Sequence, residues 1–235
     1  MNKSRIAVVG LELIGKAHLE IICKNSELEP HSIVDPSNDA KLLAKLKGVP
    51  WHEDLSSIFG ADRPDGIVLA TPNQLHKSQA IDCINAGIPI LLEKPITTNI
   101  SDAKVIVRAS NEKNINVLIG HHRAHSPIIS TAKKIIDSGC LGPLTLISGY
   151  ATFYKPASYY KEAPWRSEIG GGPILINLIH EIHNFRVLCG EIESVQAIVS
   201  SAIRGYPVED TAVINFRFKN GALGNFMLSD TTSSA

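Results

Sequence analysis

One stretch near the amino terminus constrains the fold more than any other. The segment VVGLELIGKAH, residues 8–18, follows a short apolar run and leads into a helix-like segment. A strand, the pattern Gly-x-Gly-x-x-Gly and a helix together are typical of dinucleotide-binding folds, because the glycines allow a tight turn, close approach of a pyrophosphate and close strand–helix packing. Gly10 and Gly15 fill the first and third positions, and Glu12 replaces the middle glycine. We therefore expect a phosphate site at the helix amino end, in which the Glu12 carboxylate opposes the phosphate charge.

The rest of the first half alternates between apolar strands and helices. Strands are predicted over 5–10, 31–35, 49–52, 65–71, 88–94 and 116–121, and helices over 14–24, 38–48, 73–86 and 101–113, the last with Ser101 as its N-cap. Strands that are apolar on both faces and alternate with helices indicate a parallel sheet covered on both sides. The right-handed crossover rule then favours an α/β, doubly wound architecture.

The pattern changes near Pro127. Helices are predicted over 128–138 and 173–188, and strands over 144–154, 194–203, 210–221 and 222–230, with KNG as a hairpin turn. Strands that follow each other in this way indicate an α+β domain with an open, largely antiparallel sheet. We predict domains over 1–121 and 122–235. Because the chain stops just as a strand finishes, we also expect the second domain to be incomplete in this chain.

Charge and composition limit the possible partners. Lys plus Arg equal Asp plus Glu, 23 of each, which argues against a bulk electrostatic grip on nucleic acid or anionic membrane. No apolar run approaches the length of a membrane span, and the run at residues 6–9 is too short for a signal peptide. The four cysteines are far apart, which excludes a zinc knuckle or a C-x-x-C motif and predicts reduced thiols packed in the core of a cytoplasmic protein: Cys23, Cys83, Cys140 and Cys189.

Asp35 ends the second predicted strand, about 20 residues beyond the last glycine, where an acidic side chain binds the adenosine ribose in dinucleotide folds. A carboxylate there favours NAD over NADP, because it repels a 2′-phosphate. The alternative is a simple strand-end turn before Pro36.

Six motifs resemble, in order and spacing, the Gfo/Idh/MocA oxidoreductase family: VVGLELIGKAH, ATPNQLH (70–76), EKPIT (93–97), GHHRAHSP (120–127), PWR (164–166) and GGGPILINLIHEIH (170–183). The resemblance implies an amino-terminal Rossmann domain and a carboxyl-terminal α+β domain whose open sheet mediates homo-oligomerisation, as a dimer or tetramer. It also implies NAD(P)-dependent hydride transfer to or from a hydroxyl or carbonyl of a sugar, an inositol-like polyol or a related small molecule.

The resemblance assigns two catalytic residues. Lys94 matches the lysine of the E-K-P motif, which polarises the reacting oxygen, and His180 matches the helix histidine that acts as general base. The alternatives are a surface lysine and a structural histidine. The chain has Ile176 where many members have Asp, with Asn177 beside it, and His183 where an acidic residue is common.

The resemblance also implies binding residues. The expected cofactor contacts are Gly10, Leu13, Ile14, Gly15, Asp35, Thr71, Pro72, Asn73, His76, Glu93 and Lys94. The expected substrate contacts are His122, Arg123, Trp165, Arg166, Asn177 and His180. Asn73 could instead cap its helix, and the two arginines could instead form structural ion pairs. No metal site is expected from the histidines of 121–125, because a strand places His121 and His122 on opposite faces.

Two hypotheses follow. The first is an NAD-dependent dehydrogenase centred on Lys94 and His180. The second is a non-catalytic protein of the same fold, either a sensor of nucleotides or small molecules or a pseudoenzyme. Asp35, Lys94 and His180 favour the first hypothesis, whereas Glu12, Ile176 and the expected incompleteness of the second domain favour the second.

Overall fold

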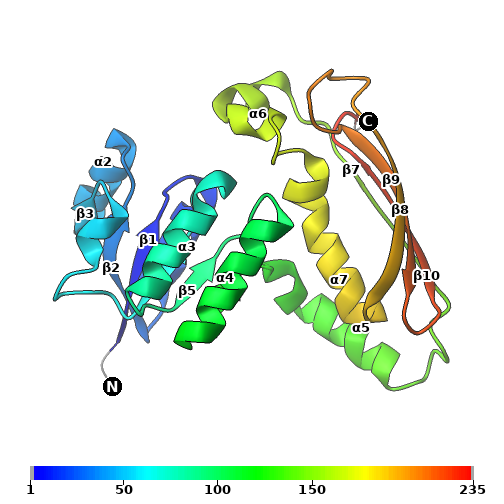
Figure 1. Ribbon diagram of the computed structural model, residues 1–235, viewed down its shortest axis with the longest axis horizontal. Coiled ribbons are helices and arrows are strands. Elements are labelled where there is room, and N and C mark those ends of the chain that lie inside the picture. The colour runs from blue at the N-terminus through cyan, green and yellow to red at the C-terminus, as the bar shows by residue number, and fades with distance from the viewer. Residues whose placement is uncertain (1–2, 234–235) are drawn as a thin grey trace. The chain divides into compact units, whose positions relative to one another are not determined.

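A six-stranded parallel sheet forms the centre of the first of two structural units (Figure 1). The computed structural model describes residues 3–233, and the chain divides into the two units between Gly120 and His121. The strands of the first sheet are β1 (Ser4–Val9), β2 (Leu28–Val34), β3 (Trp51–His52), β4 (Gly66–Leu69), β5 (Ile90–Leu92) and β6 (Val117–Ile119). Their order is β3-β2-β1-β4-β5-β6, and every pairing is parallel. The strand order reverses between β1 and β4, which is where doubly wound sheets bind ligands.

Both faces of the central strands are buried, as the apolar strands predict, whereas Leu118 of the edge strand β6 is 65% exposed. The helices are α1 (Leu13–Lys24), α2 (Asn38–Lys47), α3 (His76–Asn85) and α4 (Ile100–Lys113). Val8 belongs to a core cluster with Leu19 of α1 and Ala40 of α2. The next residue, Val9, belongs to a different cluster with Ile84 of α3 and Ile106 of α4. Successive residues of one strand therefore pack in separate cores, one on each side of the sheet.

The turn between β1 and α1 leaves no room for side chains at two glycines. Gly10 has φ +84°, and a Cβ atom there would lie 2.6 Å from the Ala70 carbonyl oxygen. A Cβ atom at Gly15 would lie 1.9 Å from the Gly10 carbonyl oxygen. Glu12 is the N-cap of α1 and has φ −70° and ψ −165°, which any residue adopts. The backbone of the turn therefore requires the first and third glycines but tolerates a side chain at the middle position.

The second unit contains a four-stranded sheet in the order β7-β10-β9-β8. Its strands are β7 (Leu146–Thr152), β8 (Ile192–Ser200), β9 (Thr211–Phe218) and β10 (Leu223–Ser229). The pairs β8–β9 and β9–β10 are antiparallel, whereas β10 and β7 are parallel. One face packs on Phe185 of helix α7 (Ile179–Cys189), through the aromatic rings of Phe216, Phe218 and Phe226. Helices α5 (Pro127–Asp137) and α6 (Ala157–Glu162) complete the unit.

The other face of this sheet carries an exposed apolar row. Ile198 of β8 pairs with Val213 of β9, Val213 pairs with Met227 of β10, and Met227 pairs with Tyr150 of β7. All four side chains are exposed. The row crosses the whole sheet, because directly paired residues point to the same face.

Three expectations about local structure are wrong. The N-cap of α4 is Asn99 rather than Ser101, because the Asn99 side chain accepts a hydrogen bond from the Asp102 N–H. The sixth strand ends at Ile119, and His122–His125 form a 3₁₀-helical turn, so His121 and His122 do not alternate along a strand.

The expectation that the thiols are packed in the core holds for only half of them. All four cysteines are free, and Cys83 and Cys189 are buried, whereas Cys23 and Cys140 are exposed. Burial raises the pKa of the Cys83 thiol to about 12. Within residues 3–233, no helix combines the length and the apolar character needed to span a bilayer.

The close packing of α1 on β1 predicts that Gly15→Ala lowers the free energy of unfolding by about 1–3 kcal/mol, because the added methyl group meets rigid backbone. Chemical denaturation measures this difference. The matched control is Gly60→Ala, since nothing lies within 4 Å of a Cβ atom at Gly60. We expect the control to stay within about 0.5 kcal/mol of the wild type. Equal stability of the two variants would contradict the packing.

Candidate functional site

A cleft of about 590 Å³ opens at the carboxyl ends of β1, β2 and β4, where the strand order reverses. It is lined by the β1–α1 turn, the β2–α2 turn and the loop after β4. Four of the predicted cofactor residues line it: Gly10, Asp35, Thr71 and Pro72. The other seven are not among its lining residues: Leu13, Ile14, Gly15, Asn73, His76, Glu93 and Lys94.

Asp35 connects two of these turns. Its Oδ2 atom accepts a 2.7 Å hydrogen bond from the Leu11 N–H, and its Oδ1 atom accepts a 2.8 Å hydrogen bond from the Ser37 N–H. The bond from Ser37 closes the strand-end turn that the sequence offered as an alternative role for Asp35. The bond from Leu11 connects the carboxylate to the glycine turn between β1 and α1. Backbone N–H donors thus fix both carboxylate oxygens in the cleft.

The cleft is strongly acidic. Its lining includes one ammonium group, that of Lys16, and five carboxylates: Glu12, Asp35, Asp39, Glu53 and Asp54. Such an excess of negative charge opposes the binding of an additional phosphate group. Glu12 is exposed, and its side chain makes no capping hydrogen bond to α1.

His76 is a buried link between two loops. One ring nitrogen lies 2.8 Å from the Pro95 carbonyl oxygen, and the other lies 2.9 Å from the Thr71 carbonyl oxygen. Burial lowers the pKa of His76, although the bonds to these carbonyls oppose the change. The ring therefore joins the loop after β4 to the loop after β5. Asn73 lies within the 3₁₀ turn Asn73–Leu75, and the N-cap of α3 is Leu75, so Asn73 does not cap α3.

Glu93 is buried at the end of β5, beside half-buried Lys94. Its Oε1 atom lies 2.8 Å from Nε2 of His18, a residue of α1 that the sequence did not single out. Burial alone would raise the pKa of the Glu93 carboxyl, but the His18 ring, the Lys94 N–H and the Lys94 ammonium together lower it. No local sequence signal identifies this pair, because its members are 75 positions apart.

In the second unit, several imidazole rings gather around buried His180. The His122 ring centroid lies 4.7 Å from that of His180, with the rings inclined at 65°. The His121 centroid lies 6.1 Å from that of His180, and the His121 ring stacks on His183 at 4.4 Å. The 3₁₀ turn after β6 produces this arrangement, since it brings both His121 and His122 to the helix that carries His180.

His183, the histidine that stacks on His121, is influenced by burial and by two neighbouring basic side chains. Burial lowers the pKa of His183, and Arg186 and His125 lower it further. Within residues 3–233, no group of three or more His, Cys, Asp or Glu side chains is placed to hold a metal ion. The imidazole rings around His180 are of a type that can donate or accept hydrogen bonds and transfer protons near neutral pH.

Glycines also shape the segment before His180. A Cβ atom at Gly171 would lie 2.5 Å from the Arg166 carbonyl oxygen, and one at Gly172, where φ is +81°, would lie 2.7 Å from Oε1 of Glu209. That same oxygen accepts a 2.8 Å hydrogen bond from the Ile174 N–H. The segment Ile174–Leu178 is a π-helical turn that leads directly into α7. The glycine run therefore lets the start of this helix dock on Glu209.

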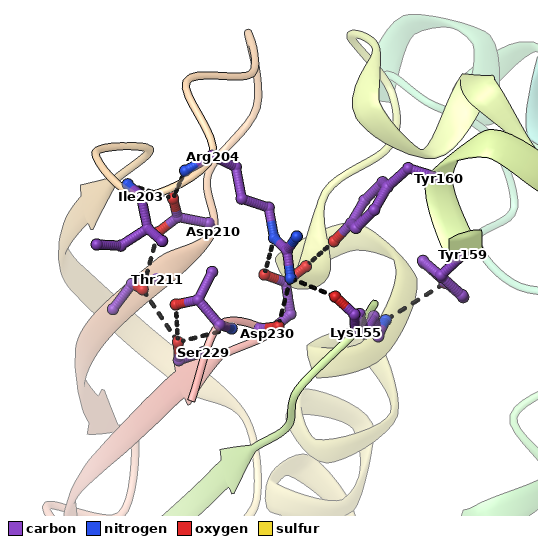
Figure 2. Close-up of polar contacts among 10 residues, drawn as sticks. Lys155, Tyr159, Tyr160, Ile203, Arg204, Asp210, Thr211, Ser229 and Asp230 are labelled. Atoms are coloured by element: carbon purple, nitrogen blue, oxygen red, sulfur yellow. Dashed lines mark hydrogen bonds and ion pairs between the residues drawn. The ribbon is translucent and has the colours of Figure 1, made fainter. Parts of the chain in front are cut away.

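Glu209 lies in the loop between β8 and β9. Figure 2 shows the polar network of Arg204, Asp210 and Asp230 that holds this loop in place. The Arg204 guanidinium donates to Asp230 Oδ1 at 3.0 Å and to the carbonyl oxygens of Asp230 and Lys155, both at 2.7 Å. The hydroxyl of Tyr160 donates to the other carboxylate oxygen of Asp230. Burial and this contact raise the pKa of Tyr160. The network joins β10, α6 and the loop before β9, and so supports the segment that leads to His180.

Two predicted substrate residues have buried donors without acceptors. Within residues 3–233, neither Nδ2 of Asn177 nor Nε1 of Trp165 has a hydrogen-bond partner. Buried polar atoms in native proteins are almost always paired, so each of these two donors can serve a further acceptor, such as a water molecule or a polar ligand.

The two predicted substrate arginines already have partners within the protein. Arg123 forms an ion pair with Glu181. Arg166 donates to the Tyr159 carbonyl oxygen at 2.8 Å, and its guanidinium lies 4.0 Å from the centre of the Tyr159 ring. Arg123 therefore forms the structural ion pair that the sequence left open as an alternative, whereas the partners of Arg166 are a backbone carbonyl and an aromatic ring. Contact of either arginine with a substrate stays a prediction.

Several known proteins are similar to this chain. It is 25% identical to the rhizopine catabolism protein MocA of Rhizobium meliloti over 213 aligned residues. The alignment covers 88% of this chain and 66% of that protein. It is 28% identical to an inositol 2-dehydrogenase of Rhodococcus erythropolis over 225 aligned residues. This second alignment covers 92% of this chain and 62% of that enzyme. The chain thus spans about two thirds of the length of these curated relatives, or less.

A solved structure matches closely. The WlbA dehydrogenase of Bordetella pertussis, in complex with NADH and UDP-GlcNAcA, superposes with a TM-score of 0.93 at 28% identity, over 98% of this chain and 72% of that one. Residues 4–121 match the family model described as an oxidoreductase family with an NAD-binding Rossmann fold. Residues 129–235 match the model of the GFO/IDH/MocA carboxyl-terminal domain. The chain belongs to the Gfo/Idh/MocA family of oxidoreductases.

Proposed function

We propose that this chain is an NAD-dependent dehydrogenase that oxidises a CH–OH group of a sugar, an inositol-like polyol or a related small molecule, or reduces the corresponding carbonyl. The observation that carries the proposal is the cleft at the reversal of strand order, where Gly10 has no room for a side chain and Asp35 is fixed by two backbone N–H groups. The bound NADH in WlbA and the activity named for inositol 2-dehydrogenase support it.

The residues of the cleft fit NAD better than NADP. The Asp35 carboxylate is positioned to accept hydrogen bonds from ribose hydroxyls, and the surrounding carboxylates repel a 2′-phosphate. Gly10 and the amino end of α1 would hold the pyrophosphate. When bound, NAD supplies the hydride acceptor.

The protein's own side chains supply the rest of the chemistry. The ammonium of Lys94, at the end of β5, polarises the reacting oxygen of the substrate. The imidazole of His180 accepts the hydroxyl proton as hydride leaves the carbon. Asn177 and Trp165 donate hydrogen bonds to substrate oxygens through their unpaired buried donors. Asn177 cannot relay a proton, so His180 acts without the carboxylate that Ile176 replaces.

The alternative is a non-catalytic protein that binds a nucleotide or small molecule on the same fold. Glu12 favours this alternative, because its carboxylate lines the cleft where a pyrophosphate would lie. Binding and turnover measurements distinguish the two proposals.

We predict that the wild type binds NAD and that Glu12→Gly binds it roughly tenfold more tightly, a difference of about 1.4 kcal/mol, because a carboxylate–phosphate repulsion is removed. Isothermal titration calorimetry measures both affinities. Glu12→Gln separates the charge from the side-chain volume, and Glu29→Gln removes the same charge from an exposed position of β2. No binding by the wild type or by Glu12→Gly would contradict the cofactor assignment.

Lys94→Met and His180→Gln should each lower kcat by about 10²–10⁴-fold, because each removes a group that acts in the transition state. NAD reduction in the presence of inositol or UDP-GlcNAcA provides the assay, and the affinity for NAD should change little. Lys104→Met, on the exposed surface of α4, is the matched control. Turnover by the wild type and by both variants at the same rate would show that these residues are not catalytic.

We also propose that two copies of the chain associate through the exposed row formed by Ile198, Val213, Met227 and Tyr150, because an apolar row across an open sheet is suited to a second, equivalent sheet. Sedimentation velocity should show dimers or larger oligomers, and Val213→Glu should yield monomers. A wild type that remains monomeric at high concentration would contradict this interface.

A further inference from the structure

Neither His18 nor Glu93 lines the cofactor cleft, and no role has so far been assigned to His18. His18 lies on α1, one helical turn beyond Gly15, and Glu93 directly precedes Lys94. The Nε2 atom of His18 and the Oε1 atom of Glu93 are 2.8 Å apart, and their side chains are only 22% and 10% exposed. A contact this short between largely buried groups holds both side chains in one geometry.

The surroundings of the Glu93 carboxylate are built to receive it. Gly120 makes room, because a Cβ atom there would lie 2.7 Å from Oε1 of Glu93. The Glu93 N–H donates to the Leu69 carbonyl oxygen at 2.9 Å, which fixes its backbone against the end of β4. The Glu93 side chain is therefore confined to a position in which one carboxylate oxygen contacts His18 and the other faces the Lys94 N–H.

Glu93 acts directly on Lys94. Its Oε2 atom accepts a 3.3 Å hydrogen bond from the Lys94 N–H, and its charge attracts the Lys94 ammonium. A buried carboxylate that loses its partner either takes up a proton or moves toward water. In both cases, the backbone and the ammonium of Lys94 lose the group that orients them.

We propose that His18 is a positioning residue: its ring holds the Glu93 carboxylate at the end of β5, and through it holds Lys94 in the geometry required for hydride transfer. The proposal rests on the catalytic role proposed above for Lys94. Helix α1 then has two roles in the site: its amino end follows the glycine turn of the cofactor cleft, and its residue His18 sets the position of Lys94 through Glu93.

Steady-state kinetics with NAD and inositol or UDP-GlcNAcA test the proposal on the full chain. We expect His18→Ala to lower kcat by about tenfold or more, because small misplacements of reacting groups are costly, while its Kd for NAD stays within about twofold of the wild type. His18→Gln should recover most of the lost activity, since its amide N–H can donate to Glu93. The matched control is His31→Ala, which removes a hydrogen-bonded ring on β2 that contacts Ser32 and Asp62 instead. An unchanged kcat in His18→Ala, or an equal loss in His31→Ala, would overturn the proposal.

A second measurement needs neither cofactor nor substrate. NMR titration of ¹³C-labelled glutamate carboxyls, with Glu93 assigned from Glu93→Gln, follows its ionisation directly. The pKa of Glu93 should rise in His18→Ala and stay near the wild-type value in His31→Ala. If the wild type neither binds NAD nor turns over, the proposed function fails and, with it, the role in hydride transfer. An unchanged Glu93 titration in an otherwise active enzyme would overturn the positioning role alone.

Discussion

The contact between Gly15 and the Gly10 carbonyl oxygen is the constraint on which the first unit depends. A methyl group at Gly15 would approach that oxygen to 1.9 Å, so α1 can pack this closely on β1 only without a side chain there. This approach directs the amino end of α1 toward the cleft and brings His18 to Glu93. Both the proposed phosphate site and the proposed positioning of Lys94 therefore depend on one backbone contact.

Charge is distributed unevenly along the sheet edge of this unit. The cleft that includes Asp35 has a large excess of carboxylates, and it suits ribose hydroxyls better than additional phosphate. At β5, by contrast, the Glu93 carboxylate is paired with His18 and lies beside Lys94. The net charge of the chain is zero, yet an acidic cleft and the ammonium group of Lys94 lie at the ends of neighbouring strands.

Features that depend on short-range sequence patterns could be predicted. The prediction failed for residues whose contacts are distant in the sequence and for a strand that ends earlier than its apolar run suggests. Gly10, Gly15 and Asp35 were predictable because turn, helix and strand end follow one another within a few positions. His121 and His122 were misplaced because β6 ends at Ile119, and a single turn of 3₁₀ helix then brings both rings toward His180. The pairing of His18 with Glu93 could not be predicted, since it depends on the sheet order and not on local sequence.

The central proposal is that NAD binds at the carboxyl edge of the first sheet and that the ammonium of Lys94 and the imidazole of His180 act on the substrate during hydride transfer. A crystal structure of the chain with NADH and a bound substrate tests it most directly. The account predicts that both side chains contact the reacting oxygen of the substrate and that Asp35 contacts the adenosine ribose. NADH bound elsewhere, or Lys94 and His180 facing different cavities, would contradict it.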